Sequence, residues 1–281
     1  VKKRVDLGFL DYSTLDLRHW ALERELRFNR AATSDIYRAV RTITRKSGGG
    51  LELDGPGAVV EYALEMRRFD ESFVLAARPW AVDGPLAEAM GREVAGFHAK
   101  AELRPQGGGG KALKYTIDSN AKLIRELAPK LGETRVEALI AATDAEFFRH
   151  EALLNARRDS GFARLCHADL HLGNILLENG RPVLFDCIEF NDILSDIDVQ
   201  YDLAFLLMDL DFRRRRDAAV RVLSAYVDEG RRHFGPDLLA GLAALPLMMS
   251  VRAGVRAHVQ AHSGDLEGAS AYLDAGLAHL A

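Results

Sequence analysis

The segment CHADLHLGNILLENGRPVLFDCIEF, residues 166–190, contains two short apolar runs on either side of Asn179-Gly180. Asn-Gly between two apolar runs is the strongest short-range signal of a β-hairpin, with a type I′ turn at the pair. A turn at this position brings Asn174 and Asp186 together at the open end of the hairpin. The segment therefore predicts a hairpin that delivers an amide and a carboxylate to one place.

The same two side chains predict a departure from regular strand geometry. Strict alternation along two paired strands would point Asn174 and Asp186 to opposite faces, so we expect Asp186 to lie in a loop. Asp169 precedes Asn174 by five residues, in the loop before the first strand. Carboxylate and amide oxygens are the ligands that Mg²⁺ prefers. The segment thus predicts a magnesium site made by Asn174 and Asp186 beside Asp169.

The spacing of these residues matches a known catalytic pattern. His-x-Asp-x-x-x-x-Asn, followed by a hairpin and a further Asp, has the outline of the kinase catalytic loop and its metal-binding Asp. In that arrangement Asp169 accepts the proton of an attacking hydroxyl, and Asn174 and Asp186 hold the metal. His167 would support the loop through hydrogen bonds. The pattern predicts phosphoryl transfer from ATP with Mg²⁺.

Two other readings of nearby residues are weaker. His167 and His171 have the spacing of helical zinc ligands, but Ala168 stands where a metalloprotease needs Glu. The glycines before Lys111 resemble a phosphate-binding loop only superficially, because Ala112 replaces the required Ser or Thr. We expect neither histidine to take part in the chemistry, and we expect a flexible loop before Lys111.

Composition limits the class of protein. The chain has 281 residues, of which 48% are hydrophobic and 28% charged, as in ordinary globular proteins. Its 37 Lys and Arg against 41 Asp and Glu give a net charge of -4, which does not favour nucleic acid as a partner. Two cysteines indicate a reducing, cytoplasmic environment. No apolar run of about 18 residues is evident, so we expect no membrane span.

The rest of the chain predicts an α+β protein with two unequal lobes. Ser13 and Thr14 precede a helical pattern, and two alternating segments predict neighbouring antiparallel strands at 36–45 and 58–66. Helical periodicity then dominates, at 85–101, 111–131, 134–157 and 217–281, with breaks expected at Gly230, Gly235 and Gly264. We expect a small β-rich N-lobe at 1–80 and a large helical C-lobe at 81–281.

The residues of the opening segment, H-A-D-L-H-L-G-N-I and L-F-D-C-I-E-F, resemble the aminoglycoside phosphotransferase and choline kinase group. Four further stretches are similar to one bacterial branch of that group: V-D-L-G-F-L-D-Y-S-T-L, E-Y-A-L-E-M-R-R-F, D-V-Q-Y-D-L-A-F-L-L-M-D-L and S-V-R-A-G-V-R-A. The resemblance implies a protein-kinase-like fold and a small-molecule kinase. Relatives in the branch often carry a second, P-loop kinase domain after this one.

The resemblance also implies nucleotide-binding residues. The hinge between the lobes, where backbone groups meet adenine, would be Met66, Arg67, Arg68 and Phe69. Glu25 would pair with a strand lysine that grips the ATP phosphates. The alignment places that lysine and a glycine-rich hairpin before Val1, so the N-lobe is expected to be truncated. Lys2, on the same strand face, either substitutes for the lysine or is solvated.

Further polar residues lie in the later helices. Asp202 is placed as a helix N-cap, and the resemblance adds contact with the catalytic loop. Asp198 is either a further acidic group near the metal or faces solvent. Arg252 and Arg256 share one helix face, where they either hold an anionic substrate or form surface salt bridges.

Two hypotheses follow for the function. The first is an ATP- and Mg²⁺-dependent kinase that phosphorylates a hydroxyl of a small metabolite or an aminoglycoside-like acceptor. The second is a kinase-like binding or regulatory module that lacks the ATP lid and positions a partner domain. The sequence does not name the acceptor.

Overall fold

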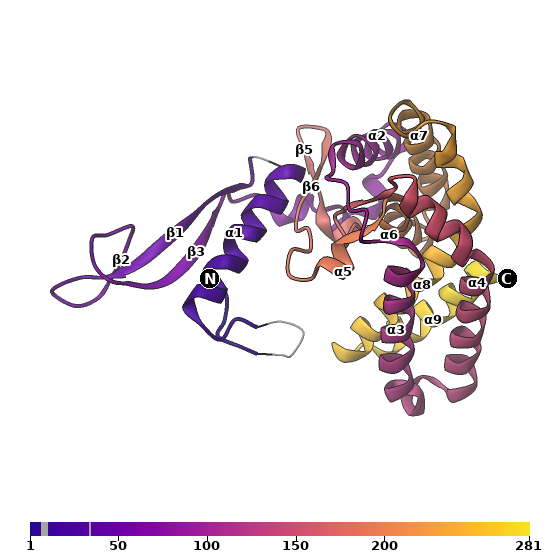
Figure 1. Cartoon of the computed structure of the whole chain (residues 1–281), viewed down its shortest axis with the longest axis horizontal. Helices are drawn as coiled ribbons and strands as arrows, with labels where there is room; N and C mark the ends of the chain where they lie inside the picture. Colours follow the sequence, from indigo (N-terminus) through magenta and orange to yellow (C-terminus); the bar gives the residue numbers. More distant parts are fainter. Residues whose placement is uncertain (7–10, 34) are drawn as a thin grey trace.

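The computed structural model describes residues 1–6, 11–33 and 35–281 and shows two unequal lobes (Figure 1). The small lobe consists of helix α1 and a three-stranded antiparallel sheet in the order β2-β1-β3. Its elements are α1 (Leu15–Ala32), β1 (Tyr37–Arg45), β2 (Leu51–Leu53) and β3 (Val59–Met66). The two-lobed α+β fold expected from the sequence is confirmed.

The beginning of α1 follows from its capping residue. The Thr14 side chain accepts a hydrogen bond from Leu17 N at 3.2 Å, which satisfies one of the free amides of the first turn. Leu22 and Leu26 are buried on the face of α1 that turns inward. The predicted helix start and the antiparallel pairing of β1 with β3 are both confirmed.

The large lobe is mainly helical, and α2 packs on α7, α3 on α4, and α8 on α9. Its helices are α2 (Gly84–Lys100), α3 (Gly109–Leu131), α4 (Glu133–Asp159), α5 (Asp192–Ser195), α6 (Val199–Phe212), α7 (Arg216–Phe234), α8 (Leu245–His262) and α9 (Leu266–Leu280). Its strands are β4 (Ala163–Leu165), β5 (Ile175–Glu178), β6 (Arg181–Leu184) and β7 (Asp196–Asp198). Short 3-10 helices are η1 (Glu71–Phe73), η2 (Leu75–Ala77), η3 (Pro79–Ala81), η4 (Leu172–Asn174) and η5 (Pro236–Ala244). Almost the whole of α6 is buried at the centre of this lobe.

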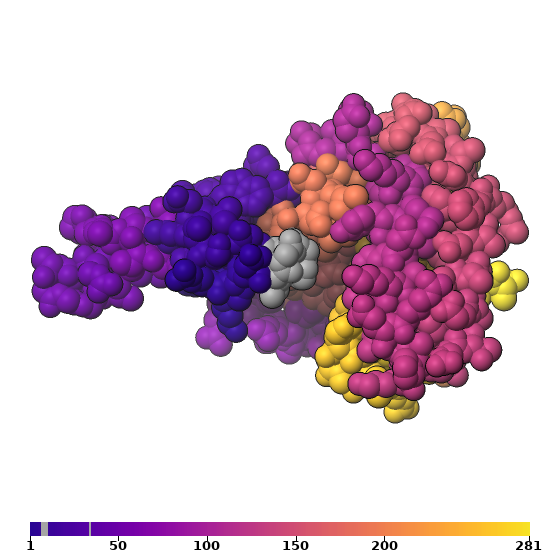
Figure 2. All heavy atoms as spheres, turned by 60° about the horizontal axis from the view of Figure 1, so that its bottom comes forward, coloured from indigo at the N-terminus to yellow at the C-terminus, as the bar shows by residue number. Residues whose placement is uncertain are grey.

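Strands β5 and β6 form the hairpin that the Asn-Gly pair predicts. Ile175 pairs with Leu184 and Leu176 with Val183. Asn179 and Gly180 have φ values of 51° and 74°, and positive φ at both central positions defines a type I′ turn. Register and turn type are therefore as predicted, and the hairpin lies at the junction of the two lobes (Figure 2).

The prediction that Gly230 breaks a helix was wrong. Gly230 lies inside α7, where an added Cβ would come within 2.7 Å of Leu238 Cδ2. A side chain at this position would press on Leu238 of η5, so the glycine permits close packing and does not form a turn. The breaks at Gly235 and Gly264 are found, and both have positive φ, 72° and 93°.

The expectation that no segment is apolar over the length of a membrane span was wrong for one helical segment. Residues Pro236–His262, which join η5 and α8, have a mean hydropathy of 1.7 over an 18-residue window. The segment is long and apolar enough to cross a membrane, but 61% of that window is buried inside the protein. Leu247, Met248 and Val251 belong to the main core. The structure therefore accounts for this segment as a core helix.

Candidate active site

The predicted catalytic loop, between β4 and β5, is held in place by Asp202. One carboxylate oxygen of Asp202 accepts a hydrogen bond from His167 N at 3.0 Å, and the other accepts one from Ala168 N at 2.8 Å. Ala168 has a φ of 71°, which is unusual for a residue with a side chain. Arg252 donates to the Ala168 carbonyl oxygen at 3.0 Å. These bonds hold a strained backbone directly before Asp169.

The expectation that Asp202 caps its helix was wrong. The N-cap of α6 is Asp198, whose Oδ1 accepts from Gln200 N at 2.8 Å, and Asp202 lies one turn further on. Both positions carry an Asp, so spacing alone could not separate them. The contact with the catalytic loop that the resemblance implies is present.

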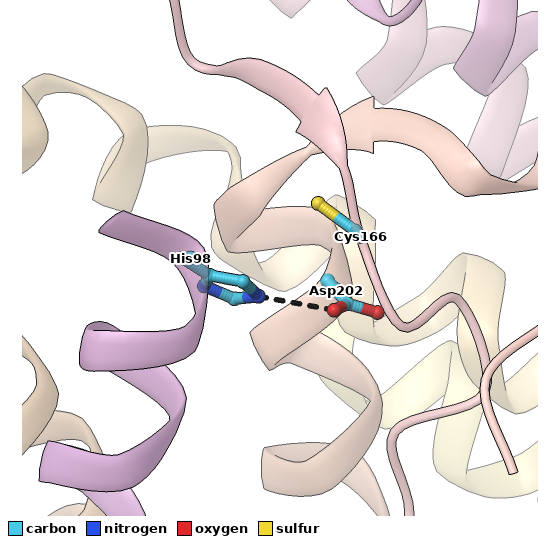
Figure 3. Close-up of side chains that lie close together, drawn as sticks. All are labelled: His98, Cys166 and Asp202. Atoms are coloured by element: carbon cyan, nitrogen blue, oxygen red, sulfur yellow. Dashed lines mark hydrogen bonds and ion pairs between the residues drawn. The ribbon is translucent and has the colours of Figure 1, made fainter. Parts of the chain in front are cut away.

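Asp202 also joins a buried cluster with His98 and Cys166 (Figure 3). His98 Nε2 lies 3.0 Å from Asp202 Oδ2, and His98 Nδ1 lies 3.0 Å from Tyr226 Oη. Burial opposes ionisation, but the hydrogen bond and charge of His98 lower the pKa of Asp202. The atoms of His98 and Asp202 that would ligate a metal are already paired, so we interpret the cluster as a structural link between α2, α6 and the loop.

Asp169 is held by two neighbours in the catalytic loop. Asn174 Nδ2 donates to Asp169 Oδ2 at 2.8 Å and to its backbone oxygen at 2.9 Å. His171 Nε2 lies 3.4 Å from the same Oδ2. Burial opposes ionisation, yet His171, His167 and Arg252 together lower the pKa of Asp169 to about 2. Asp169 is therefore an anion at neutral pH with one oxygen already engaged.

The contact of His171 with Asp169 was not predicted, because neither histidine was expected to take part in the chemistry. Gly173 N donates to His171 Nδ1 at 2.9 Å, so Nδ1 is unprotonated and the ring hydrogen is on Nε2. Nε2 lies at an ion-pair distance from Asp169 Oδ2, 3.4 Å. His167 is different: it is fully buried and its Nε2 lies 2.9 Å from the Phe185 carbonyl oxygen, as expected for a support of the loop.

Asp186 lies in a loop, as predicted. It follows β6, has a φ of 64°, and donates its backbone N–H to Tyr37 Oη at 3.1 Å. Burial and the nearby charges of Asp169 and Glu25 raise the pKa of the Asp186 carboxyl. Within the described ranges, the side-chain oxygens of Asp186 accept no hydrogen bond, and neither does Asn174 Oδ1. These free oxygens beside a second carboxylate are a donor set that fits a hard divalent cation.

Lys2 forms an ion pair with the glutamate that the resemblance assigns to the nucleotide site. Its Nζ lies 2.6 Å from Glu25 Oε2 and 3.0 Å from Glu189 Oε1. Burial opposes the charge, but the two carboxylates raise the pKa of Lys2. Lys2 is thus not simply solvated. Sequence reasoning missed Glu189, although its place three residues after Asp186 in the same loop could have suggested it.

The hinge residues lie where β3 leaves the small lobe. Arg67 pairs with Glu178 of β5 at 2.8 Å, and the Phe69 ring contacts the Phe185 ring with centroids 5.2 Å apart. Met66 and Arg68 are exposed. The hinge is therefore attached to the hairpin that carries Asn174 and Asp186.

Two expectations about the later helices were wrong. Asp198 does not face solvent, because it is buried and both of its carboxylate oxygens are bound by Arg157, at 2.7 and 2.9 Å. Arg252 does not form a surface salt bridge, since it is 5% exposed and donates to backbone oxygens behind the catalytic loop. Arg256 lies over the Tyr272 ring, 5.7 Å from its centroid. Burial of this kind depends on tertiary packing that helical periodicity does not show.

The fold and the arrangement of the loop define a protein of the two-lobed, kinase-like class. Among solved structures, a glucosamine kinase is similar over 92% of this chain and 69% of its own, with a TM-score of 0.56 and 17% identity. An ethanolamine kinase from Plasmodium vivax is similar over 92% of this chain and 70% of its own, with a TM-score of 0.53 and 14% identity. At such identities the likeness shows the fold.

Residues 22–242 match the model of the phosphotransferase enzyme family, and the chain belongs to this family. Uncharacterized proteins from Mycobacterium bovis and Mycobacterium tuberculosis are 33% identical over 230 residues, which is 80% of this chain. The match covers 45% of each of those proteins, so the chain spans less than half of the length of the curated relatives that it matches.

Proposed function

We propose that the protein is an ATP- and Mg²⁺-dependent kinase that transfers the γ-phosphate of ATP to a hydroxyl of a small molecule. The observation that carries the proposal is the Asp169 carboxylate, whose Oδ2 is bound by Asn174 at 2.8 Å. Its other oxygen is left to accept a proton, and its pKa of about 2 keeps it ionised. Membership of a phosphotransferase family supports the same reaction.

Each residue of the loop has a distinct part in this mechanism. Asp169 orients the acceptor hydroxyl and takes its proton as transfer proceeds. Asn174 and His171 fix the Asp169 carboxylate through Oδ2, so that its orientation is set before the acceptor binds. Asp202 and Arg252 keep the backbone before Asp169 in its strained conformation.

The free oxygens of Asn174 and Asp186 would hold Mg²⁺. The bound ion would neutralise the charge that develops on the transferred phosphoryl group. Lys2, fixed by Glu25, would contact the nucleotide phosphates, and the backbone of Met66, Arg67, Arg68 and Phe69 would receive the adenine. The Lys2–Glu25 pair favours an enzyme over a kinase-like module without catalysis, because the nucleotide site keeps a positioned cation.

The acceptor is proposed at the level of its reacting group. The similar structures are kinases of glucosamine, an amino sugar, and of ethanolamine, an amino alcohol, which supports a hydroxylated small molecule for this chain. The relatives are longer than the chain, which leaves room for a P-loop partner domain in a longer parent protein. We propose the cytoplasm as the location, where ATP and Mg²⁺ are available.

The test is Mg²⁺-ATP turnover across sugars, amino alcohols and aminoglycosides. Asp169→Asn should lower kcat by roughly 100- to 10,000-fold, because a general base contributes that much. The exposed Asp228, changed to Asn, is the matched control and should leave kcat unchanged. Normal turnover by Asp169→Asn would refute the assigned base, and full activity without a divalent cation would refute the metal site.

A further inference from the structure

A cavity of about 230 Å³ lies on the side of α1 that faces the end of α2. Both helices contribute to its wall, and the chain around the catalytic loop closes its floor. Its lining residues are Arg27, Phe28, Ala31, Phe97, Lys100, Ala101, Glu102, Leu165, Cys166 and Cys187. The catalytic carboxylates Asp169 and Asp186 do not line it, so the cavity is separate from the proposed site of phosphoryl transfer.

The floor and the rim of this cavity differ in character. Phe28, Cys166 and Cys187 are buried and give the floor an apolar surface. Arg27 and Lys100 are exposed at the rim, and neither forms an ion pair with any residue that the structure describes. The one carboxylate of the lining, Glu102, is paired with Arg104. The rim therefore carries two positive charges that are not paired with a carboxylate of the described residues, and the Arg27 guanidinium lies 5.4 Å from the centroid of the Phe28 ring on the apolar floor.

We propose that this cavity is a binding site for a small amphipathic anion, an acyl or aryl carboxylate. The apolar part of such a ligand would lie on Phe28 and the two thiols, where its burial is favourable. Its carboxylate would meet Arg27 and Lys100 in charge-assisted contacts. A cation of the same shape would be repelled at the rim, and a neutral analogue would lose those contacts.

The position of the cavity connects it to the active site without being part of it. Cys166 directly precedes His167 of the catalytic loop, and Cys187 directly follows Asp186. Asn29, next to Phe28, accepts a hydrogen bond from Cys187 N at 2.8 Å. A ligand in the cavity therefore contacts α1 and the Asp186 loop together. Occupancy is expected to affect how firmly these two segments are held.

Direct binding tests the proposal without reference to turnover. We expect octanoate to bind in isothermal titration calorimetry, and octylamine and 1-octanol to bind at least about tenfold more weakly. The double change Arg27→Glu and Lys100→Glu should weaken octanoate by a similar factor, whereas Lys122→Glu, an exposed change on α3, should not. Equal binding of octylamine, or unaltered binding after the double change, would overturn the proposal.

Filling the cavity gives an independent test. Ala31→Trp should abolish octanoate binding, and Ala145→Trp, at an exposed position on α4, should preserve it. Matching thermal unfolding curves for the two variants would show that the loss is local. Asp169→Asn should bind octanoate as the unaltered protein does, and a loss of affinity there would place the ligand in the catalytic cleft instead.

The alkylation of the two cysteines gives a third test of ligand binding. The two cysteines both line this cavity, and no other thiol is present in the sequence. Both thiols are buried, 2% and 3% exposed, so their alkylation should be slow. Octanoate should slow alkylation of Cys166 and Cys187 by iodoacetamide further, as read by mass spectrometry, and octylamine should not. Alkylation that proceeds at the same rate with saturating octanoate would contradict a ligand in this cavity.

Discussion

Replacing Lys2 by Met is expected to destabilise the protein in a manner that depends on pH. Lys2 lies 2.6 Å from Glu25 and 3.0 Å from Glu189, and the three side chains are 21%, 16% and 7% exposed. At an effective dielectric constant of about 20, each contact is worth about 6 kcal/mol before desolvation. Desolvation offsets much of this, and loss of one partner of a buried pair usually costs about 3–5 kcal/mol. We expect Lys2→Met to lower the free energy of unfolding by about 3 kcal/mol, near the lower limit, because the three side chains keep some contact with water.

The pH dependence follows from the carboxylate that Lys2 leaves behind. Burial raises the pKa of Glu189 above its ordinary value of 4.5, and Lys2 opposes that rise. Without Lys2 the folded-state pKa of Glu189 increases further. A carboxyl that has a higher pKa in the folded state than in the unfolded state stabilises the fold at pH values below its unfolded-state pKa. This stabilisation is lost as the pH rises through the folded-state pKa. The deficit of the variant should therefore be small near pH 4.5 and grow as the pH rises.

Urea denaturation followed by circular dichroism, at about pH 5 and about pH 8, measures the deficit. The matched control is Lys3→Met, which removes the neighbouring exposed lysine and should change the free energy of unfolding by less than about 0.5 kcal/mol. The reasoning fails if the two variants are equally stable, or if the deficit of Lys2→Met is the same at both pH values.

Three further predictions concern the catalytic loop. His171→Gln should lower kcat with little change in the KM for ATP, because the Asp169 carboxylate loses one of its two fixing contacts; a change in KM alone would contradict this role. Asp202→Asn should cost about 2–3 kcal/mol in urea denaturation, since it weakens two backbone hydrogen bonds and the contact with His98; a loss under about 0.5 kcal/mol would show that Asp202 is dispensable. Because the pKa of Asp169 is about 2, protonation of this carboxylate should not lower kcat/KM at pH values above about 4. A fall in kcat/KM above about pH 4 that is absent in Asp169→Asn would refute that value.

The hairpin could be predicted from the sequence because its determinants are local. Asn179-Gly180 fixes the turn, the turn fixes the register, and the register brings Asn174 near Asp186. The same argument predicted that Asp186 leaves strand geometry, which its φ of 64° confirms. The start of α1 was equally accessible, because Thr14 caps it through a contact only three residues away.

The surroundings of the loop could not be predicted because they depend on distant segments. Arg252 reaches Ala168 across 84 positions and Lys2 reaches Glu189 across 187. Helical periodicity places Arg252 on a face but does not say what covers that face. Periodicity also could not distinguish a glycine that breaks a helix from Gly230, which permits close packing inside one.

The hydrogen bonds and ion pairs around Asp186 attach the proposed metal site to the small lobe. Tyr37 of β1 and Asn29 of α1 bind the backbone of residues 186 and 187, and Lys2 binds Glu189. The Asp169 loop is instead fastened to helices of the large lobe through Asp202 and Arg252. The two loops are also bound to each other, since Ile188 N donates to the His167 carbonyl oxygen at 3.0 Å. The Asp186 segment therefore makes contacts with both lobes. A rotation of the small lobe against the large one would therefore act on the Asp186 segment from two sides, so that the proposed metal site, more than Asp169, would respond to the angle between the lobes.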